Sequence, residues 1–204
     1  MIKAVIFDLG QVIIPFRLER GLATLAARSA CPPAEVAARA MASDLPLRFE
    51  QGLLEPDDFF RQFSALLGLE VDYPEFCDLY SSIFLPETLI PGSLLAGLRP
   101  NYRLVLLSNT NAIHFPWVLE RYPLLGCFHD YVLSYQVRAL KPAPEIYLAA
   151  LERARCRPEE CFYTDDIPAY VEAARQHGIQ AAEFRGLEPL EAELRARGIR
   201  WQDG

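Results

Sequence analysis

Short apolar runs recur along the chain and predict the strands of a buried sheet. They are rich in Val, Ile, Leu, Phe and Tyr, and from the second run onwards they alternate with segments of helical periodicity. This alternation is typical of a parallel sheet with helices on both faces, so the sequence predicts a doubly wound α/β fold. The predicted strands are Ala4–Leu9, Leu104–Ser108, Tyr131–Ser134, Cys161–Thr164 and Gln180–Phe184. The predicted helices between them include Ile113–Arg121, Pro144–Arg153 and Pro168–His177.

Residues 15–91 interrupt this alternation of strands and helices, because they show helical patterns with no convincing strand between them. We therefore expect an inserted helical subdomain at 15–91 and an α/β core formed by residues 1–14 and 92–204. Proline stands at or near the start of most of the segments, where it suits the first turn of a helix. The predicted helices of the insertion are Leu18–Ala30, Pro33–Ala42, Pro56–Leu67 and Pro74–Phe84.

The composition narrows the class of protein. Of 204 residues, 51% are hydrophobic and 23% charged, which is typical of a globular chain. The net charge of −7 argues against a broad nucleic-acid or anionic-membrane surface. The 5 cysteines are odd in number and form no CxxC pair, so we expect reduced thiols. The N-terminal apolar run meets Asp8 too early for a signal peptide, and we expect a cytoplasmic protein without a membrane span.

Polar residues follow the predicted strands where a parallel sheet binds its ligands. Asp8 follows the first strand, Ser108 and Asn109 end the second, and Asp165 with Asp166 ends the fourth. Ligands bind outside the carboxyl ends of such strands, so these side chains are expected to converge. Each alone is most often a helix cap or a turn former, and only the combination indicates a catalytic site.

These residues occur in the order of the four motifs of the haloacid dehalogenase superfamily, which they resemble. Lys141 stands where the third motif has its lysine. Phe-Asp-Leu-Gly-x-Val at 7–12, Leu-Ser-Asn-Thr-Asn at 107–111 and Lys-Pro-x-x-Glu-Ile-Tyr at 141–147 are similar to one branch. That branch contains sugar-phosphate phosphatases such as the α-D-glucose-1-phosphate phosphatases. Phe-Glu-Gln-Gly at 49–52 resembles part of its helical cap, and the likeness covers nearly the whole chain.

The resemblance implies a phosphatase that acts on a small phosphomonoester, such as a sugar phosphate. Asp8 would be the nucleophile that forms an aspartyl-phosphate. Ser108, Asn109 and Lys141 would bind the phosphoryl oxygens, where fixed donors stabilise developing charge. Lys141 is one of only two lysines among the 20 Lys and Arg residues, which favours a required ammonium group. His114 would reach the substrate or the cap, unless it is an exposed helical histidine without a chemical role.

The resemblance also implies Mg²⁺, held by Asp8, the carbonyl of Gly10, Asp165 and Asp166. Three carboxylates brought together would raise one another's pKa, and a divalent cation with oxygen ligands relieves that repulsion. The alternative role for the paired acids is to cap the helix predicted near Pro168.

Two positions depart from the family pattern. Most phosphatases of the superfamily have a second Asp two residues after the nucleophile as general acid and base, and this chain has Gly10 there. We expect that Gln11 or a cap residue orients the water, or that the substrate has a good leaving group, such as a sugar 1-phosphate. Tyr170 replaces an Asn that the branch usually has after the paired acids, which puts secondary support of the metal site in doubt.

Two rival functions stay open. A 2-haloacid dehalogenase would use the same nucleophile without a metal, but it would have no reason to keep both Asp165 and Asp166. A catalytically idle binding protein would keep the fold while losing the chemistry. Arg17, Arg20 and Arg48 are the basic candidates for substrate contact within the insertion. We expect a monomer or a small homo-oligomer with a small-molecule substrate.

Overall fold

The computed structural model describes residues 1–201, and its core is a parallel sheet of five strands in the order β3-β2-β1-β4-β5. All four strand pairings are parallel, which confirms the predicted fold class. Each strand begins and ends within two residues of its predicted bounds. The strands are β1 (Ala4–Phe7), β2 (Arg103–Ser108), β3 (Asp130–Leu133), β4 (Cys161–Asp165) and β5 (Gln180–Glu183).

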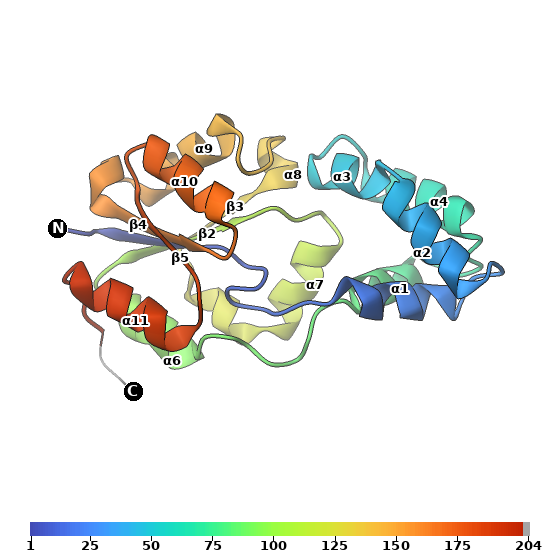
Figure 1. Ribbon diagram of the computed structural model, residues 1–204, viewed down its shortest axis with the longest axis horizontal. Helices are drawn as coiled ribbons and strands as arrows, with labels where there is room; N and C mark the ends of the chain where they lie inside the picture. The colour runs from blue at the N-terminus through green and yellow to red at the C-terminus, as the bar shows by residue number, and fades with distance from the viewer. Residues whose placement is uncertain (202–204) are drawn as a thin grey trace.

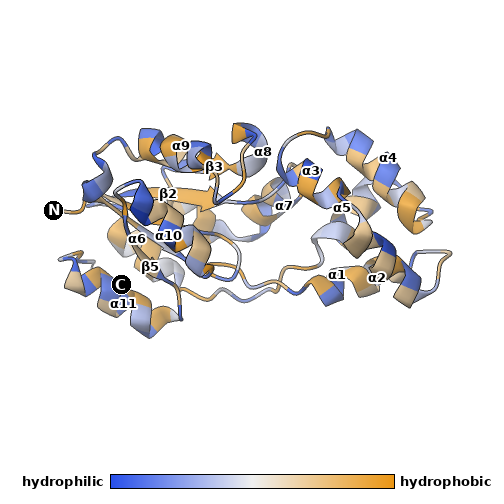
Figure 2. Cartoon of the chain, turned by 45° about the horizontal axis from the view of Figure 1, so that its top comes forward, coloured by the Kyte–Doolittle hydropathy of each residue, from blue (hydrophilic) through white to orange (hydrophobic). Residues whose placement is uncertain are grey.

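Helices cover both faces of this sheet because successive side chains of each strand point to opposite sides. Val5 and Phe7 of β1 belong to one buried cluster, and Ala4 and Ile6 belong to the other. In Figure 2 the middle of strand β2 is hydrophobic, whereas the helices around it have mixed polar and apolar surfaces. The first face is covered by α6 (Gly92–Leu98), α7 (His114–Arg121) and α11 (Leu187–Ala196), and the second by α9 (Pro144–Ala154) and α10 (Pro168–Gln176), as Figure 1 shows.

Five further helices form a separate group, which we call the helical subdomain. It lies on the side of the molecule opposite the N-terminus (Figure 1). Its own core is rich in aromatic residues, with Phe59 stacked on Phe49 at a centroid distance of 4.2 Å and on Phe63 at 5.0 Å. Its helices are α1 (Leu18–Ala26), α2 (Pro33–Ala42), α3 (Leu45–Glu50), α4 (Pro56–Leu67) and α5 (Tyr73–Ser81).

Some of these bounds differ from the sequence-based expectations. The bounds of α2 and α4 are as predicted, whereas α1 ends at Ala26 and α5 ends at Ser81, short of the predicted Ala30 and Phe84. Several short elements were not predicted, because they span too few residues for a clear period. They are α3, α6, α8 (Ser134–Val137) and the 3₁₀ turns η1 (Pro123–Cys127) and η2 (Pro158–Glu160). None of the helices within residues 1–201 has the length and apolar character needed to cross a membrane.

Two chain segments join the helical subdomain to the core, and they run side by side in opposite directions. Phe16 and Phe84 form an antiparallel bridge. The Arg17 N–H donates to the Ile83 carbonyl at 2.9 Å, and the Leu85 N–H donates to the Pro15 carbonyl at 2.9 Å. The connection is therefore a short paired ribbon rather than two independent linkers.

Candidate active site

The candidate site lies at the carboxyl ends of the three central strands. Asp8 directly follows β1, which is paired on one side with β2 and on the other with β4. Ser108 is the last residue of β2 and Asp165 is the last residue of β4, so the sheet order itself brings them beside Asp8. All three side chains are buried. The sequence-based expectation that these strand ends converge is met.

Lys141 links the two buried aspartates at the centre of the site. Its Nζ lies 2.6 Å from Asp8 Oδ1 and 2.6 Å from Asp165 Oδ2. It also donates to the Tyr163 hydroxyl at 3.3 Å, and the ring of Tyr170 lies 5.1 Å from it. Burial alone would lower the pKa of Lys141, but the two carboxylates outweigh this and raise it, so the ammonium stays charged.

The side chain of Asn109 holds the main chain of Lys141. Asn109 Oδ1 accepts from the Lys141 N–H at 2.8 Å, and Asn109 Nδ2 donates to the Lys141 carbonyl at 3.3 Å. The peptide bond between Lys141 and Pro142 is cis. The side-chain amide of Asn109 thus positions the lysine, and the main-chain N–H of Asn109 is left as its candidate donor to a ligand.

The acidic cluster has the donor set of a magnesium site. Carboxylate oxygens of Asp8, Asp165 and Asp166 all lie within 4.8 Å of one another, and Gly10 follows Asp8 by two residues. Burial raises the pKa of Asp8, the charge of Asp165 raises it further, and the ammonium of Lys141 opposes both. Burial and the charge of Asp165 likewise raise the pKa of Asp166. One ammonium does not balance three carboxylates, so a hard divalent cation with oxygen ligands fits this site.

An aspartate at position 10, where this chain has glycine, would require the ring of Phe16 to shift. A Cβ atom added at Gly10 would lie 2.8 Å from Cε1 of Phe16, whose ring occupies this side of the loop. The side chain of Gln11 is also engaged, since its Nε2 donates to the Phe16 carbonyl at 2.9 Å. Neither position therefore offers a free acid or base to the cavity.

His114 connects the core to the helical subdomain instead of standing on an exposed helical face. It is buried, and its ring stacks on Tyr80 at a centroid distance of 4.3 Å. Nδ1 lies 3.1 Å from Asn111 Nδ2, and Nε2 lies 3.2 Å from the Tyr80 carbonyl. An amide donor faces Nδ1 and a carbonyl acceptor faces Nε2, which selects the neutral ring with its hydrogen on Nε2. Burial lowers the pKa of His114 from 6.5 to about 4.

This neutral histidine predicts that stability falls in mild acid. Between pH 6.5 and about 4 the unfolded chain binds a proton at His114 that the folded chain does not, so this contribution is present above pH 6.5 and is lost as pH falls. We expect the free energy of unfolding to drop by about 3 kcal/mol across this window. Urea unfolding at several pH values measures it, and a His114→Gln variant should show a shallower slope. Parallel slopes for the two proteins would contradict the prediction.

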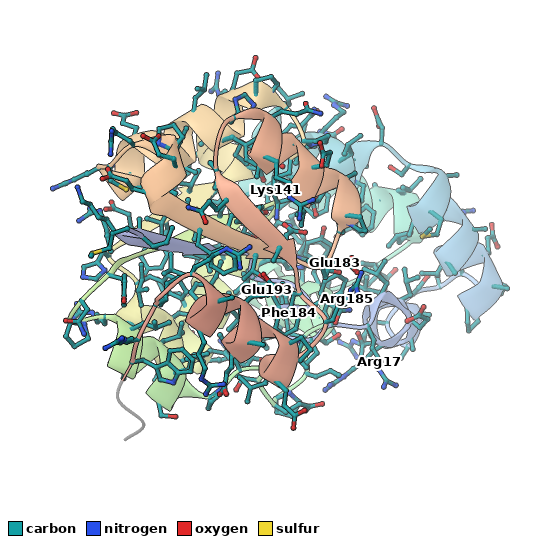
Figure 3. All side chains as sticks on the ribbon, turned by 60° about the vertical axis from the view of Figure 1, so that its left-hand side comes forward. Arg17, Lys141, Glu183, Phe184, Arg185 and Glu193 are labelled. Carbon is teal, nitrogen blue, oxygen red and sulfur yellow. The ribbon has the colours of Figure 1, made fainter. Side chains whose placement is uncertain are left out.

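A cavity of about 290 Å³ lies between the helical subdomain and the strand ends. Gly10, Ser108 and Asn109 line it from the core. Glu50 and Tyr80 line it from the helical subdomain, and the rest of its wall is mostly apolar. Among the described residues, no arginine lines this cavity. The candidate substrate contacts Arg17, Arg20 and Arg48 lie outside it, and Figure 3 shows Arg17 far from Lys141.

Two residues of this site were not among those selected from the sequence. The Tyr163 hydroxyl donates to Asp165 Oδ2. The sequence could have indicated this contact, because Tyr163 stands two residues before Asp165 and so lies on the same face of β4. Glu50 was quoted only as part of the 49–52 motif, although it contributes the charged group of the helical subdomain that lines the cavity.

Comparisons with known proteins agree with this architecture. Residues 2–178 match the family described as haloacid dehalogenase-like hydrolase. The chain is 26% identical over 186 residues to a D-ribitol-5-phosphate phosphatase of Bacteroides thetaiotaomicron, covering 88% of this chain and 90% of that protein. A haloacid dehalogenase family enzyme of the same organism, solved with magnesium and inorganic phosphate, has a TM-score of 0.80 and 29% identity over 90% of this chain and 94% of its own.

Dehalogenase structures share the fold at greater distance. The L-2-haloacid dehalogenase PA0810 has a TM-score of 0.63 and 20% identity, covering 90% of this chain and 84% of its own. That likeness shows a common fold and nothing about the reaction. The family match spans most of the sequence, including every strand except β5. The chain belongs to the haloacid dehalogenase-like hydrolase family.

Proposed function

We propose that this chain is a Mg²⁺-dependent phosphatase that hydrolyses a small phosphomonoester, a sugar phosphate, through an aspartyl-phosphate. The observation that carries the proposal is the contact of Lys141 with both Asp8 and Asp165, beside Asp166. Gly10, Ser108 and Asn109, which belong to the same strand ends, line the cavity. The phosphatase relative and the structural relative solved with magnesium and phosphate support it. Membership of the α-D-glucose-1-phosphate phosphatase branch stays a prediction.

In this proposal the core residues have different tasks. A carboxylate oxygen of Asp8 attacks phosphorus, and the bond to the leaving alcohol breaks. The Ser108 hydroxyl and the Asn109 main chain stabilise the charge on the phosphoryl oxygens. Lys141 adds a fixed positive charge and holds Asp8 in position. Water then cleaves the aspartyl-phosphate and restores Asp8.

The metal would be held by Asp8, the Gly10 carbonyl, Asp165 and Asp166. When bound, Mg²⁺ supplies positive charge to the phosphoryl oxygens and lets the phosphate approach the Asp8 carboxylate. Asp165 already accepts from Lys141, from Tyr163 and from the Ile167 N–H at 2.9 Å. Asp166 is half-buried, so we assign it the direct contact and Asp165 a supporting one.

The helical subdomain would act as the cap that covers the substrate. It contributes Glu50, Tyr80 and apolar side chains to the cavity wall. Closing over the phosphate would exclude bulk water and strengthen the electrostatic contacts within. The paired ribbon at residues 15–17 and 83–85 is the proposed hinge.

The acid cluster favours a phosphatase over a dehalogenase. A metal-free attack on carbon gains nothing from keeping Asp166 beside Asp165, since each unpaired carboxylate near a buried group is costly. A phosphatase needs these oxygens for its cation.

Magnesium dependence is the test of the proposed function. Phosphate release from a panel of sugar phosphates and p-nitrophenyl phosphate should require Mg²⁺ and stop with EDTA. Millimolar Mg²⁺ should also raise the melting temperature, because a ligand that binds only the folded state stabilises it. An Asp166→Asn variant should lose both effects, whereas a matched Asp57→Asn variant at an exposed position should keep them. Chloride release from 2-chloropropionate without metal, and no phosphate release, would overturn the proposal.

A further inference from the structure

Glu50 is a partly buried residue of the cavity wall. It ends α3 and lines the cavity together with Gly10, Ser108 and Asn109. Within residues 1–201, no hydrogen bond or ion pair satisfies its side chain. A negative charge at the C-terminal end of a helix is unfavourable, and partial removal from water adds to this. Glu50 thus carries an unpaired, partly desolvated carboxylate at the cavity wall.

Neighbouring residues fix the position of Glu50. Phe49, directly before it, is buried and stacks on Phe59 in the core of the helical subdomain. Gly52, two residues after it, has φ of +67°, and a Cβ there would lie 2.1 Å from the Tyr135 carbonyl of α8. Only glycine allows the chain to approach α8 this closely. The end of α3 is thus held between an aromatic core and the main chain of the α/β core.

The titratable groups that interact with Glu50 carry no positive charge. They are the hydroxyls of Tyr80 on α5 and Tyr170 on α10. Tyr80 stacks on the neutral His114, and the ring of Tyr170 covers Lys141. On its own helix the charged neighbour is Arg48, which lies 4.0 Å from Asp44. Glu50 therefore faces the catalytic cluster across Tyr170 without a counter-ion.

We propose that Glu50 is the general acid and base of the reaction, in place of the aspartate that is absent at position 10. The proposal rests on the proposed phosphatase function. In the first step Asp8 forms its bond to phosphorus, the bond to the leaving oxygen breaks, and that oxygen takes the proton of Glu50. In the second step the Glu50 carboxylate takes a proton from water. The resulting hydroxide bonds to phosphorus as the bond to Asp8 breaks.

Two observations support this assignment. Position 10 is a glycine packed against the ring of Phe16, so the core supplies no carboxyl group there, whereas Glu50 lines the same cavity from the helical subdomain. Burial also raises the pKa of Glu50 to about 7, which suits a group that gives and takes a proton at neutral pH.

Leaving groups of different acidity provide the test. Native protein, Glu50→Gln and a matched Glu55→Gln variant, whose side chain is exposed, are assayed with an alkyl or sugar phosphate and with p-nitrophenyl phosphate. For the poor leaving group, kcat/KM of Glu50→Gln should fall by about 10²- to 10⁴-fold. For p-nitrophenyl phosphate kcat/KM should fall by less than about 10-fold, because this leaving group needs little protonation. Glu55→Gln should match the native protein.

Two further readouts separate a proton-transfer role from a structural one. The kcat/KM of the native protein for the alkyl phosphate should decline above about pH 7, and this decline should be absent in Glu50→Gln. With p-nitrophenyl phosphate the variant should accumulate aspartyl-phosphate on rapid quenching, because the first step stays fast while the attacking water has lost its base. Its melting temperature should equal or exceed the native value, since the variant removes an unpaired and partly desolvated carboxylate.

An equal loss of kcat/KM for both substrates, or no loss for either, would overturn the assignment of Glu50. If the native protein releases no phosphate from any substrate, the proposed function itself fails, and that outcome is distinct. A Gly52→Ala variant, which would push α3 away from α8, should show the same preference for the better leaving group as Glu50→Gln.

Discussion

Asp8→Asn is expected to abolish phosphate release, with a fall in kcat of at least about 10⁴-fold, because an amide cannot replace the attacking carboxylate. The substitution nearly preserves shape and removes one charge from the acidic cluster. Lys141 keeps its second contact, with Asp165, so the fold should persist. The measurement is steady-state phosphate release in Mg²⁺, paired with a thermal melt of each protein.

The chemical identity of the nucleophile can be checked separately. Native protein quenched in acid during turnover should carry a hydroxylamine-sensitive phosphate, and Asp8→Asn should carry none. A variant that keeps more than about one hundredth of the native rate would show that Asp8 is not the nucleophile. The loss should be the same for good and poor leaving groups, in contrast to the pattern expected for Glu50→Gln.

Lys141→Met is expected to lose both activity and stability. The substitution leaves Asp8 and Asp165 buried without their shared cation, and removing one partner of a buried ion pair costs about 3–5 kcal/mol. Urea unfolding in EDTA measures this loss without a contribution from metal. Phosphate release in saturating Mg²⁺ measures the loss of the fixed charge at the phosphoryl group.

The other lysine of the chain is a natural control. The side chain of Lys3 is 63% exposed and lies 2.9 Å from Glu160. Exposed pairs of this kind contribute about 0–1 kcal/mol, so Lys3→Met should unfold almost as the native protein does. Equal stabilities for Lys141→Met and Lys3→Met would contradict the central role of Lys141 in the site.

The sheet and its strand-end residues could be predicted because buried strands have a clear hydrophobic pattern in the sequence. A strand buried on both faces is a continuous apolar run, and a polar residue directly after it is conspicuous, as at Asp8, Ser108 and Asp165. Lys141 lies outside any strand and was found through its motif. The central cluster is thus the part of the site that sequence patterns describe best.

The other residues of the site depend on tertiary contacts that produce no hydrophobic pattern in the sequence. Within an apolar strand, Tyr163 looks like a core residue, and its hydroxyl gains a role only where β4 ends beside Lys141. Helix α3 spans six residues around Pro46, too few to show a period. Glu50 faces the cavity because Phe49 and Gly52 are fixed by distant segments. The sequence allowed His114 either a contact with substrate or cap or an exposed position without a role, and only the fold shows its contact with Tyr80.

The paired ribbon between core and helical subdomain also bears on how such a protein diversifies. Because Arg17 and Ile83 are hydrogen-bonded neighbours, the 65 residues between them leave the core and return to it at one point. An insertion whose ends meet can be lengthened, shortened or exchanged without moving any strand of the sheet, since loops closed at their base tolerate such changes. The residues at the strand ends and most residues of the helical subdomain can therefore change independently of one another, whereas Glu50 would be constrained by the role proposed for it.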